Sequence, residues 1–450
     1  MTERTLISDL AAKAGETVCI QGWVDVRRDQ GKLVFFDFRD RSGTVQGVVL
    51  PGDEALMTAA KEVRNEFVVS VEGIVNNRPE KNIQEGKLNG AIELEIRGIE
   101  VLSAADSLPF ELDAELNLDT LFDNRPLTLR RKEEQAIFRV QHEIVKAYRD
   151  FLTQEGFMEF QSPKLVGDDA EGGAGIFKVE YFTKTAYLAT SPQLYKQILV
   201  GAFERVFTIG SMFRAEKHST TRHMNELAMC DLEMGFIKDH TDVMRMITKL
   251  MRSITDHLAT SSTKEFAALD ATIPLVGDGD IFPSMKLREA QELIKRETGE
   301  DKTDEPDLEP EDERWLSEYA RTHLGSDFVF ITHYPVSKRP FYTMEDPEDP
   351  GFTRSFDLLF RGVELMSGAQ RVHDHDMLVE KIRDKGLDPE KFSFYLQAFK
   401  YGIPPHGGMG MGLERLTQKY LGLDNVKEAA LFPRDLNRID TLLSKNETDV

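Results

Sequence analysis

Arginines and glycines from two distant segments form the pattern in this sequence that could most directly do chemistry. One segment, at 408–415, reads Gly-Met-Gly-Met-Gly-Leu-Glu-Arg, and the other carries Arg214, Arg222 and His223. Alternating glycines let a backbone lie close to a flat or charged ligand, and arginines from two segments can clamp a polyphosphate from both sides. Together they predict a nucleotide site, although each arginine taken alone is more often part of a surface ion pair.

A pair of carboxylates lies between these two segments in the sequence. Asp357 and Glu364 flank the Phe-Arg-Gly string at 360–362. Magnesium usually takes one or two carboxylates together with phosphate oxygens, so such a pair beside a polyphosphate site is a reasonable Mg²⁺ seat. We therefore expect Mg²⁺ to be the cofactor that accompanies the nucleotide.

Two further cations, Lys196 and Arg371, stand in segments that are otherwise uncharged. Such placement indicates either a buried anionic group of a ligand or a structural carboxylate partner, and the residue types alone do not choose between them. Glycines around Glu171, within 168–175, suggest a lid whose carboxylate could meet an ammonium group. A plain acidic surface loop is the alternative there.

Short strands separated by turn signals predict the fold of the first domain, which we place at residues 1–105. Five strands in a domain of this length suit an OB-fold β-barrel, a class that binds oligonucleotides on one face. The turn at 40–43, Asp-Arg-Ser-Gly, predicts a hairpin between the second and third strands. The expected strands cover 18–26, 32–38, 43–49, 67–75 and 91–101.

One face of the expected barrel combines side chains that suit RNA. Arg27 and Arg28 are cations, Phe35 offers an aromatic platform, and Gln46 carries an amide that can hydrogen-bond to a base edge. The alternative, equally compatible with the residue types, is that Phe35 belongs to the core and the arginines are solvated.

The rest of the chain predicts an α+β unit. We expect a hinge at 106–130 and a second domain at 131–450, which begins with a long amphipathic helix that ends at 155. The strand pattern is interrupted at residues 266–325, which predicts an insertion. Its acidic stretch at 296–314 indicates a solvent-exposed surface. Strand signals lie at 157–163, 187–188, 205–209, 228–234 and 356–365.

Composition limits the class of protein further. The formal net charge of −22 argues against binding polyanions over the whole surface, although local basic stripes can still hold a nucleic acid. No apolar run is long enough to span a bilayer, and the start of the chain does not read as a signal peptide. The two cysteines show no metal-ligand spacing, so we expect a soluble protein of a reducing cytoplasm with no membrane partner.

Taken together, the strings resemble the signature motifs of the class II aminoacyl-tRNA synthetases. Phe-Arg-Ala-Glu at 213–216 and Thr-Arg-His at 221–223 come before the glycine-rich segment in the expected order. Within that class the resemblance is to the aspartyl-tRNA synthetases of archaeal and eukaryotic type, and it covers nearly the whole chain. It implies an N-terminal OB-fold anticodon-binding domain and a catalytic domain built on an antiparallel β-sheet. The family-like strings lie at 170–173, 191–197, 367–374 and 431–435.

The resemblance implies a role for each nucleotide-binding residue. Arg214 would contact the α-phosphate and the substrate carboxylate, and Glu216 the adenine amino group. Arg222 and His223 would hold the outer phosphates, with Arg415 on the γ-phosphate. Arg214, His223 and Arg415 would therefore be the catalytic residues. The other implied ATP ligands are Met224, Glu364 and Gly412, and the implied Mg²⁺ ligands are Asp357, Glu364 and Ser367.

The same resemblance assigns the amino acid and the anticodon. Lys196 and Arg371 would bind the side-chain carboxylate of L-aspartate, which an asparagine amide could not replace without leaving buried charge unpaired. Asp231 would balance the positive charge of Lys196. The remaining implied aspartate ligands are Glu171, Gln193, Arg214 and Ser367. In the barrel, Phe35 would stack on an anticodon base and Gln46 would bond to another, with Arg27 and Glu93 as helpers.

The implied activity is ATP-dependent formation of aspartyl-adenylate and transfer to the 3′-terminal adenosine of tRNA(Asp). Charging of tRNA(Asn) stays open because Asp25 matches neither the strict nor the tolerant version of the barrel. Leu227 stands where many relatives carry an aromatic ring against adenine, and the segment around Pro163 implies a homodimer. The alternatives are an asparaginyl-tRNA synthetase, against which Lys196 argues, and a tRNA-binding protein without activity.

Overall fold

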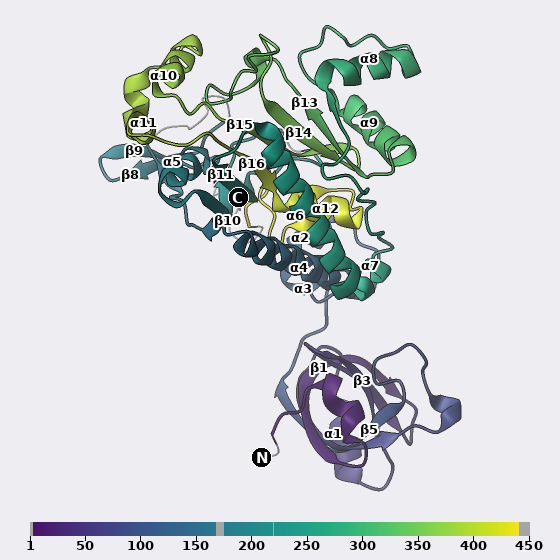
Figure 1. The fold of residues 1–450 in the computed structure, drawn as a ribbon. Coiled ribbons are helices and arrows are strands. Elements are labelled where there is room, and N and C mark those ends of the chain that lie inside the picture. The colour runs from purple at the N-terminus through teal and green to yellow at the C-terminus, as the bar shows by residue number, and fades with distance from the viewer. Residues whose placement is uncertain (1–2, 168–174, 219, 441–450) are drawn as a thin grey trace. The chain divides into compact units, whose positions relative to one another are not determined.

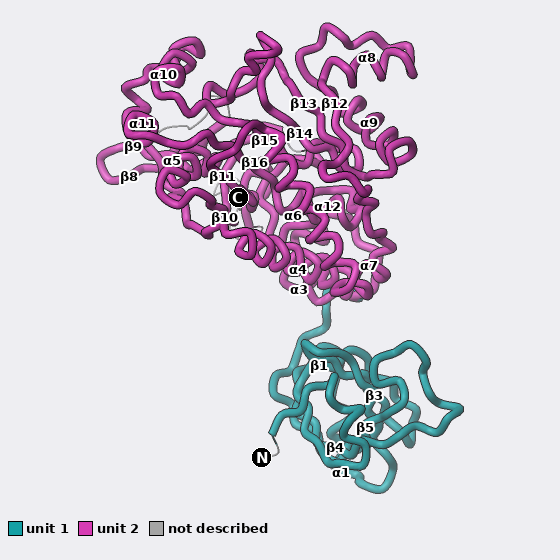
Figure 2. The backbone as a smooth tube through the Cα atoms, in the orientation of Figure 1, with its two compact units in different colours: residues 1–111 teal, residues 112–450 magenta. Residues whose placement is uncertain are grey.

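The computed structural model describes residues 3–167, 175–218 and 220–440. These fall into two compact units, residues 1–111 and 112–450, which are coloured separately in Figure 2. The division lies inside the range that the sequence suggested as a hinge. Each unit has its own buried core, so each is described separately.

The first unit is a closed five-stranded barrel, which confirms the predicted OB fold. Its strands follow the order β1-β2-β3-β5-β4 around the barrel. Residues of alternating burial build each strand, so that Val34, Phe36 and Phe38 face the core while Phe35 and Asp37 face outward. The strands are β1 (Thr17–Asp29), β2 (Val34–Asp40), β3 (Gly43–Val49), β4 (Val68–Asn77) and β5 (Ile92–Ser103).

The hairpin between β2 and β3 forms where its turn residues predicted it. Asp40 Oδ1 accepts hydrogen bonds from the backbone N–H of Ser42 at 2.7 Å and of Gly43 at 3.1 Å, which is the local bonding that favours Asp in turns. The unit also contains a helix that the strand pattern did not predict, α1 (Glu54–Glu62), whose first turn is capped by Asp53.

The second unit is built around an eight-stranded sheet in the order β12-β13-β14-β15-β16-β11-β10-β6 (Figure 1). The central pairs are antiparallel, as expected, but β6 with β10 and β12 with β13 are parallel. The strands are β6 (Met158–Glu159), β10 (Arg205–Phe213), β11 (Glu226–Gly235), β12 (Ser284–Lys286), β13 (Phe328–Thr332), β14 (Ser355–Phe360), β15 (Val363–Gln370) and β16 (His406–Gly412). A separate small sheet contains β7 (Leu165–Val166), β8 (Lys178–Tyr181) and β9 (Lys184–Leu188).

Helices cover this sheet and bury its largest apolar cluster. Side chains of α4, α6 and α12 pack with β10, β11 and β14 to β16 in one core. The long amphipathic helix predicted before residue 155 is α4. The helices are α2 (Leu118–Asp123), α3 (Arg125–Thr128), α4 (Lys132–Gln154), α5 (Gln193–Phe203), α6 (His240–Ser261), α7 (Thr263–Ala268), α8 (Leu287–Thr298), α9 (Pro310–His323), α10 (His375–Asp384), α11 (Ser393–Lys400) and α12 (Leu413–Leu421).

The strand signal at 356–365 covers two strands and not one. Arg361 and Gly362 adopt positive φ values of 46° and 83°, and the chain reverses there from β14 into β15. The reversal places Asp357 opposite Ser367 in the ladder and brings Glu364 close to both. A hairpin therefore assembles the three residues that the sequence suggested as a Mg²⁺ seat.

The expected insertion is a packed part of the second unit. Helices α8 and α9 bury Leu293 and Leu316 against Val329 of β13 in a cluster of their own. Many of the charges at 296–314 are exposed, as expected, but Glu313 of α9 is only 13% exposed and lies against Arg222.

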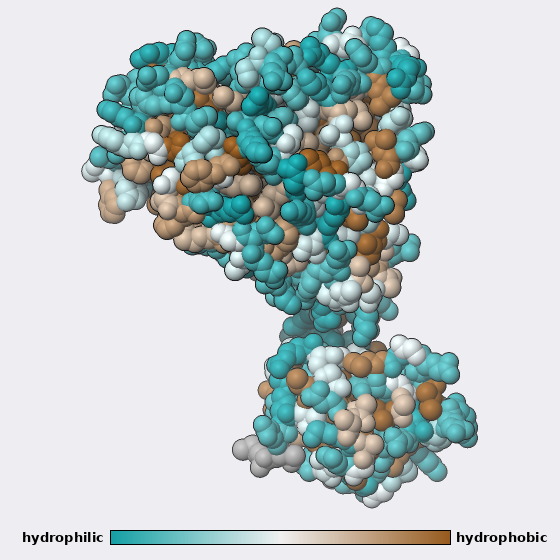
Figure 3. All heavy atoms as spheres, in the orientation of Figure 1, coloured by the Kyte–Doolittle hydropathy of each residue, from teal (hydrophilic) through white to brown (hydrophobic). Residues whose placement is uncertain are grey.

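The surface in view in Figure 3 is largely polar, with scattered apolar side chains. Among the described residues, no helix is long and apolar enough to cross a membrane. Cys230 is buried, whereas Cys19 is only partly buried, and both thiols are free.

Candidate active site

A cavity of about 330 Å³ opens over β11, β15 and β16 in the second unit. It brings together residues that lie far apart in the sequence. The sequence-predicted residues on its wall are Gln193, Arg214, Glu216, Arg222, His223, Met224, Leu227, Asp231, Glu364, Ser367, Arg371, Gly412 and Arg415. Lys196 and Asp357 lie behind that wall. Glu171 falls outside the described residues.

The glycines of β16 leave space for neighbouring side chains, a role that the sequence did not suggest. A Cβ atom at Gly408 would lie 2.2 Å from a carboxylate oxygen of Glu233, and one at Gly410 would lie 3.0 Å from a carboxylate oxygen of Asp231. Both carboxylates belong to the neighbouring strand β11. These two glycines therefore make room for buried carboxylates, and Gly410 and Gly412 also line the cavity.

The two buried cations of the site share a carboxylate. Glu233 accepts from Arg371 Nε at 2.9 Å and lies 3.5 Å from Lys196 Nζ, while Lys196 also donates to Asp231 at 2.8 Å and to the carbonyl of Met409 at 2.8 Å. Burial opposes the ionisation of Glu233, but Arg371 and Lys196 outweigh it and lower its pKa. Each of these cations therefore has a structural carboxylate partner, which is one of the two alternatives that the sequence raised, and binding of a ligand anion stays a prediction.

Sequence reasoning missed Glu233, although a signal was present. Asp231 and Glu233 alternate on the apolar strand β11, so both point to one side of the sheet. Two carboxylates in such a strand require buried partners, and Lys196 and Arg371 supply them. With two cations and two anions the cluster is formally neutral before any ligand arrives.

Polar atoms without partners mark where a ligand can bind. Among the described residues, Asp231 Oδ2 and Gln193 Nε2 are buried without hydrogen-bond partners. The described bonds of Arg371 use Nε and Nη2, which leaves Nη1 for a ligand. Burial raises the pKa of Asp231, while Lys196 opposes that shift. These groups meet at the cavity wall and suit a small zwitterion with an additional carboxylate.

Arg214 and Glu216 follow β10 in a short loop fastened by a residue that sequence reasoning did not select. Asn225 Nδ2 donates to the carbonyls of Arg214 at 2.7 Å and of Glu216 at 3.3 Å. Leu227, two residues after Asn225, lines the cavity beside them. The loop therefore presents both side chains from a fixed backbone.

Arg222 and His223 are held by neighbours in the protein. Arg222 Nη1 donates to Glu313 at 3.1 Å, and His223 Nδ1 lies 2.7 Å from the hydroxyl of Thr220. Burial is the main cause that lowers the pKa of His223, and Arg415 contributes in the same direction. His223 is therefore neutral at pH 7, with Nε2 left to meet a ligand.

The suggested Mg²⁺ seat is assembled, but one of its carboxylates is already paired. Asp357 Oδ2 accepts from Arg339 at 2.6 Å, Asp357 Oδ1 is buried without a described partner, and Ser367 donates to Glu364 at 2.7 Å. Burial, followed by the charge of Asp357, raises the pKa of Glu364 to about 7. Two carboxylates and a hydroxyl are hard oxygen donors that fit Mg²⁺ together with phosphate oxygens.

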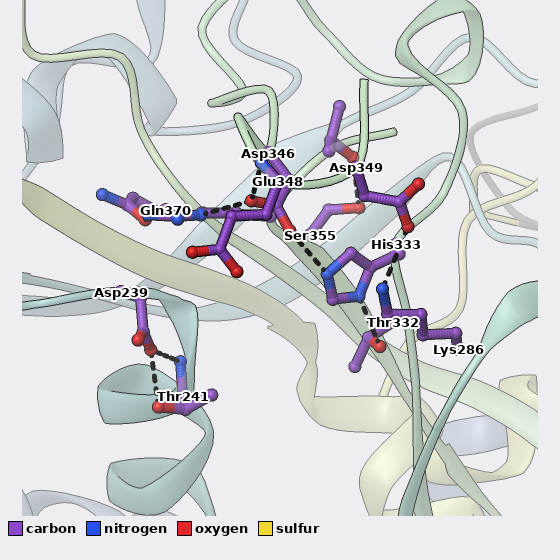
Figure 4. A network of polar contacts seen from close by, with 12 residues as sticks. Asp239, Thr241, Lys286, Thr332, His333, Asp346, Glu348, Asp349, Ser355 and Gln370 are labelled. Carbon is purple, nitrogen blue, oxygen red and sulfur yellow. Dashed lines mark hydrogen bonds and ion pairs between the residues drawn. The ribbon is translucent and has the colours of Figure 1, made fainter. Parts of the chain in front are cut away.

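Arg339 was not selected from the sequence, and a polar network holds the segment that carries it. His333 Nε2 lies 3.1 Å from Asp346 (Figure 4). Arg354 links Asp346 to Gln370, the neighbour of Arg371. The network fastens residues 333–354 to the end of β15. It therefore fixes the backbone on which Arg339 reaches the cavity.

Arg415 closes the cavity from the first turn of α12. Its Nη1 donates to the backbone carbonyl of Glu364 at 2.8 Å, which ties it to the expected metal seat. The adjacent Glu414 accepts from the N–H of Ala228 at 3.0 Å, and burial raises the pKa of its carboxyl to about 7.

In the barrel, the suggested anticodon residues lie outside the apolar core. Phe35 is partly exposed on β2 and pairs across the ladder with Arg28, which shares its side of the sheet. Arg27 lies opposite the inward-facing Phe36 and bonds to Asp29 at 3.1 Å. Gln46 and Glu93 are partly exposed on β3 and β5, which are neighbouring strands.

Family models match both units. Residues 117–436 match the model for tRNA synthetases class II (D, K and N), and residues 18–102 match the model for the OB-fold nucleic acid binding domain. The first match covers well over half of the chain, so the chain belongs to the class II tRNA synthetases of the D, K and N group.

Full-length relatives define the family more narrowly. The chain is 44% identical to the aspartate–tRNA(Asp/Asn) ligase of Thermus thermophilus, covering 97% of this chain and 99% of that protein. It is 40% identical to the aspartate–tRNA(Asp) ligase of Thermococcus kodakarensis, covering 94% and 96%. Within the class, the chain is a member of the aspartate–tRNA ligase family.

Solved structures agree with this placement. A putative aspartyl-tRNA synthetase from Leishmania major superimposes with a TM-score of 0.88 at 31% identity, covering 98% of this chain and 95% of that one. An asparaginyl-tRNA synthetase from Pyrococcus horikoshii, complexed with asparaginyl-adenylate, also gives 0.88, at 32% identity and with 98% and 100% coverage. Fold alone therefore does not separate the two amino acids, and the residues of the site must do so.

Proposed function

We propose that the chain activates L-aspartate with ATP and transfers the aspartyl group to the 3′-terminal adenosine of tRNA(Asp). The observation that carries this proposal is the buried cluster of Lys196, Arg371, Asp231 and Glu233 beside a cavity rich in arginines. Names of relatives support the same activity. Aspartyl-adenylate and pyrophosphate are the products of the first step, and aspartyl-tRNA and AMP those of the second.

Arg371 is the residue that selects the carboxylate side chain in this proposal. A guanidinium carries donors only, so Nη1 needs an acceptor from the ligand. A carboxylate offers acceptors on both oxygens and a matching charge, whereas an amide offers one acceptor and places a donor beside a cation. Lys196 acts through Asp231 and Glu233, which it holds in place from behind the wall.

Charge neutralisation accounts for the chemical step. The aspartate α-carboxylate attacks the α-phosphorus of ATP, the bond to the bridging oxygen breaks, and the electron pair leaves with pyrophosphate. Arg214 stabilises the charge at the α-phosphate, and Arg222, His223 and Arg415 hold the leaving group. Glu216 accepts from the adenine amino group. When bound, Mg²⁺ supplies further neutralisation of the phosphates, and Asp357, Glu364 and Ser367 would hold it.

The α-ammonium group needs acceptors at the cavity wall. Asp231 Oδ2 is a buried acceptor without a described partner, and Gln193 offers its amide oxygen once the side-chain amide is turned toward the ligand. Glu171 remains a proposed third acceptor. This set leaves the α-carboxylate free to meet Arg214.

The barrel is proposed to bind the anticodon. Phe35 stacks on one base, Gln46 bonds to another, and Arg27 and Glu93 contact their neighbours. Charging of tRNA(Asn) is a second candidate activity, favoured by the relatives named aspartate–tRNA(Asp/Asn) ligases. Charging assays with purified tRNA(Asp) and tRNA(Asn) test it, and no product with tRNA(Asn) would exclude it.

A homodimer and a cytoplasmic location complete the proposal. Strand β6 is the last strand of the large sheet, and Met158 on it is 38% exposed, so this edge suits pairing with a second copy. Light scattering of the purified protein at micromolar concentration tests the dimer. A monomer mass would refute it.

The activation step has a direct test. We expect ATP–pyrophosphate exchange that depends on aspartate and is absent with asparagine, because only a carboxylate satisfies Arg371. Exchange at equal rates with both amino acids would overturn the roles given to Arg371 and Lys196. The variant Arg371→Gln is expected to lose the aspartate response, with Arg383→Gln on α10 as an exposed control.

A further inference from the structure

A buried arginine lies behind the glutamine proposed to read the anticodon. Arg78 follows β4, is 9% exposed, and donates from Nη2 to Gln46 Oε1 at 2.7 Å. Its Nε donates to the carbonyl of Ile92 at 2.8 Å, and its Nη1 lies 3.4 Å from the carbonyl of Asn82. The three described acceptors belong to three different residues, so they hold the guanidinium in one orientation. All three are uncharged oxygens.

This contact determines how the amide of Gln46 is turned. A glutamine amide has an oxygen that accepts and an NH₂ group that donates, and the two ends have nearly the same shape. A guanidinium can only donate, so the end that faces Arg78 must be the oxygen. The NH₂ group of Gln46 is therefore the end available to a ligand.

Gln46 lies on the side of the barrel that carries the proposed stacking residue. It pairs across the β2–β3 ladder with Asp37, which stands two residues from Phe35 and so points the same way. Gln46 and Phe35 are both partly exposed. A base stacked near Phe35 and the NH₂ group of Gln46 can thus meet on one surface.

We propose that Arg78 is a positioning residue that presents Gln46 as a hydrogen-bond donor, so that this position of the barrel selects an anticodon base with acceptor groups at its edge. The inference rests on the proposed binding of tRNA by the barrel. The carbonyl oxygens of a pyrimidine have the required chemistry, whereas an exocyclic amino group at the same place is rejected. A cation bonded to the amide oxygen also polarises the amide, which strengthens its N–H donors.

Charging of tRNA(Asp) transcripts with each anticodon base replaced in turn tests this role. In the unaltered protein, replacing the base that Gln46 reads is expected to lower kcat/KM at least about tenfold. In Arg78→Met, kcat/KM for the unaltered transcript falls by about the same factor, and the penalty for that one replacement largely disappears. The penalties at the other anticodon positions remain.

A double-variant cycle separates positioning from a general effect on the fold. With Gln46→Ala already present, Arg78→Met is expected to cause no further loss of base discrimination. Independent effects of the two variants, or an equal loss at every anticodon position, would overturn the proposal. Arg78→Lys keeps a cation that only donates and should retain part of the discrimination, which a packing role would not produce.

Two controls keep this inference distinct from the proposed function. Arg97→Met removes a cation from an exposed position of the same barrel, where the side chain is 57% exposed, and is expected to leave base discrimination unchanged. Aspartate-dependent ATP–pyrophosphate exchange should be unchanged in every barrel variant. Absence of exchange in the unaltered protein would refute the proposed activity, whereas normal exchange and charging with discrimination intact in Arg78→Met would refute only the role of Arg78.

Discussion

Arg339 donates a hydrogen bond of 2.6 Å to Asp357, so a carboxylate expected to face Mg²⁺ is paired with a guanidinium. Arg339 also lies over the ring of Tyr334, with 3.9 Å between the guanidinium carbon and the ring centroid. The side chain of Arg339 is 15% exposed and that of Asp357 is 5% exposed, so the ion pair is largely shielded from water. The guanidinium therefore supplies the positive charge that Asp357 needs before the metal and ATP arrive.

The first prediction concerns this pair. Arg339→Met leaves Asp357 as a buried carboxylate without its cation, and we expect a loss of stability of about 3 kcal/mol. Because Mg²⁺ can replace the lost charge, the melting temperature of the variant should rise more with Mg²⁺ than that of the unaltered protein. Arg288→Met, at an exposed ion pair with Asp349, is the matched control. Equal Mg²⁺ responses in all three proteins would contradict the explanation.

Glu233 gives the second prediction. In Glu233→Gln, Arg371 loses its ionised partner and Lys196 one of its two, so we expect aspartate-dependent exchange to fall about 100-fold or more, as a loss of about 3 kcal/mol implies. Steady-state exchange kinetics measure the effect. Glu226→Gln, at the exposed start of the same strand, should behave like the unaltered protein. An unchanged KM for aspartate in Glu233→Gln would show that the cluster does not orient Arg371.

The third prediction concerns Glu313 and the nucleotide. Glu313→Gln removes a carboxylate that competes with phosphate for Arg222, so the KM for ATP should fall about two- to fivefold while the KM for aspartate stays the same. Initial-rate measurements at varied ATP give the comparison with Glu311→Gln, an exposed control on the same helix. A rise in the KM for ATP would mean that Glu313 positions Arg222 and does not restrain it.

Stability should depend on pH through Glu414. Burial raises the pKa of this carboxyl from 4.5 to about 7, so between those pH values the folded protein holds a proton that the unfolded chain has lost. Stability from this group is therefore full below pH 4.5 and is lost as the pH rises toward 7. Glu414→Gln cannot lose a proton, and we expect it to be about 1–3 kcal/mol more stable than the unaltered protein at pH 8, with the difference vanishing at about pH 4. Calorimetric melting at the two pH values tests the difference, and a variant less stable at pH 8 would contradict it.

Much of the fold could be predicted because local patterns agree with tertiary structure. Alternating or clustered apolar residues and the turn at Asp40 predicted the barrel strands. Apolar residues at helical spacing before residue 155 predicted α4. The hairpin at Arg361 and Gly362 was missed because apolar residues run through it on both sides. The helix α1 was missed because it has only 9 residues and buries only Ala60, so it shows no clear apolar face.

The site was predictable where a residue carries its own signal and not where it acts through a partner. Arg214, Arg371 and Arg415 stand out as cations in the motif segments, and the structure brings them to one cavity. Arg339 and Asn225 matter because of what they contact across strands and loops, which sequence spacing does not encode. Glu233 did carry a signal, because it alternates with Asp231 on the apolar strand β11. Arg78 is a further case, since only the barrel closure brings it to Gln46.

Aminoacylation of purified tRNA(Asp) with labelled aspartate and labelled asparagine, side by side, tests the central claim most directly. Because Arg371 presents an N–H donor and a positive charge that a carboxylate satisfies and an amide does not, we expect aspartyl-tRNA as the only product, with its formation dependent on ATP. Formation of asparaginyl-tRNA at a comparable rate, or no charging of tRNA(Asp) by aspartate, would contradict it.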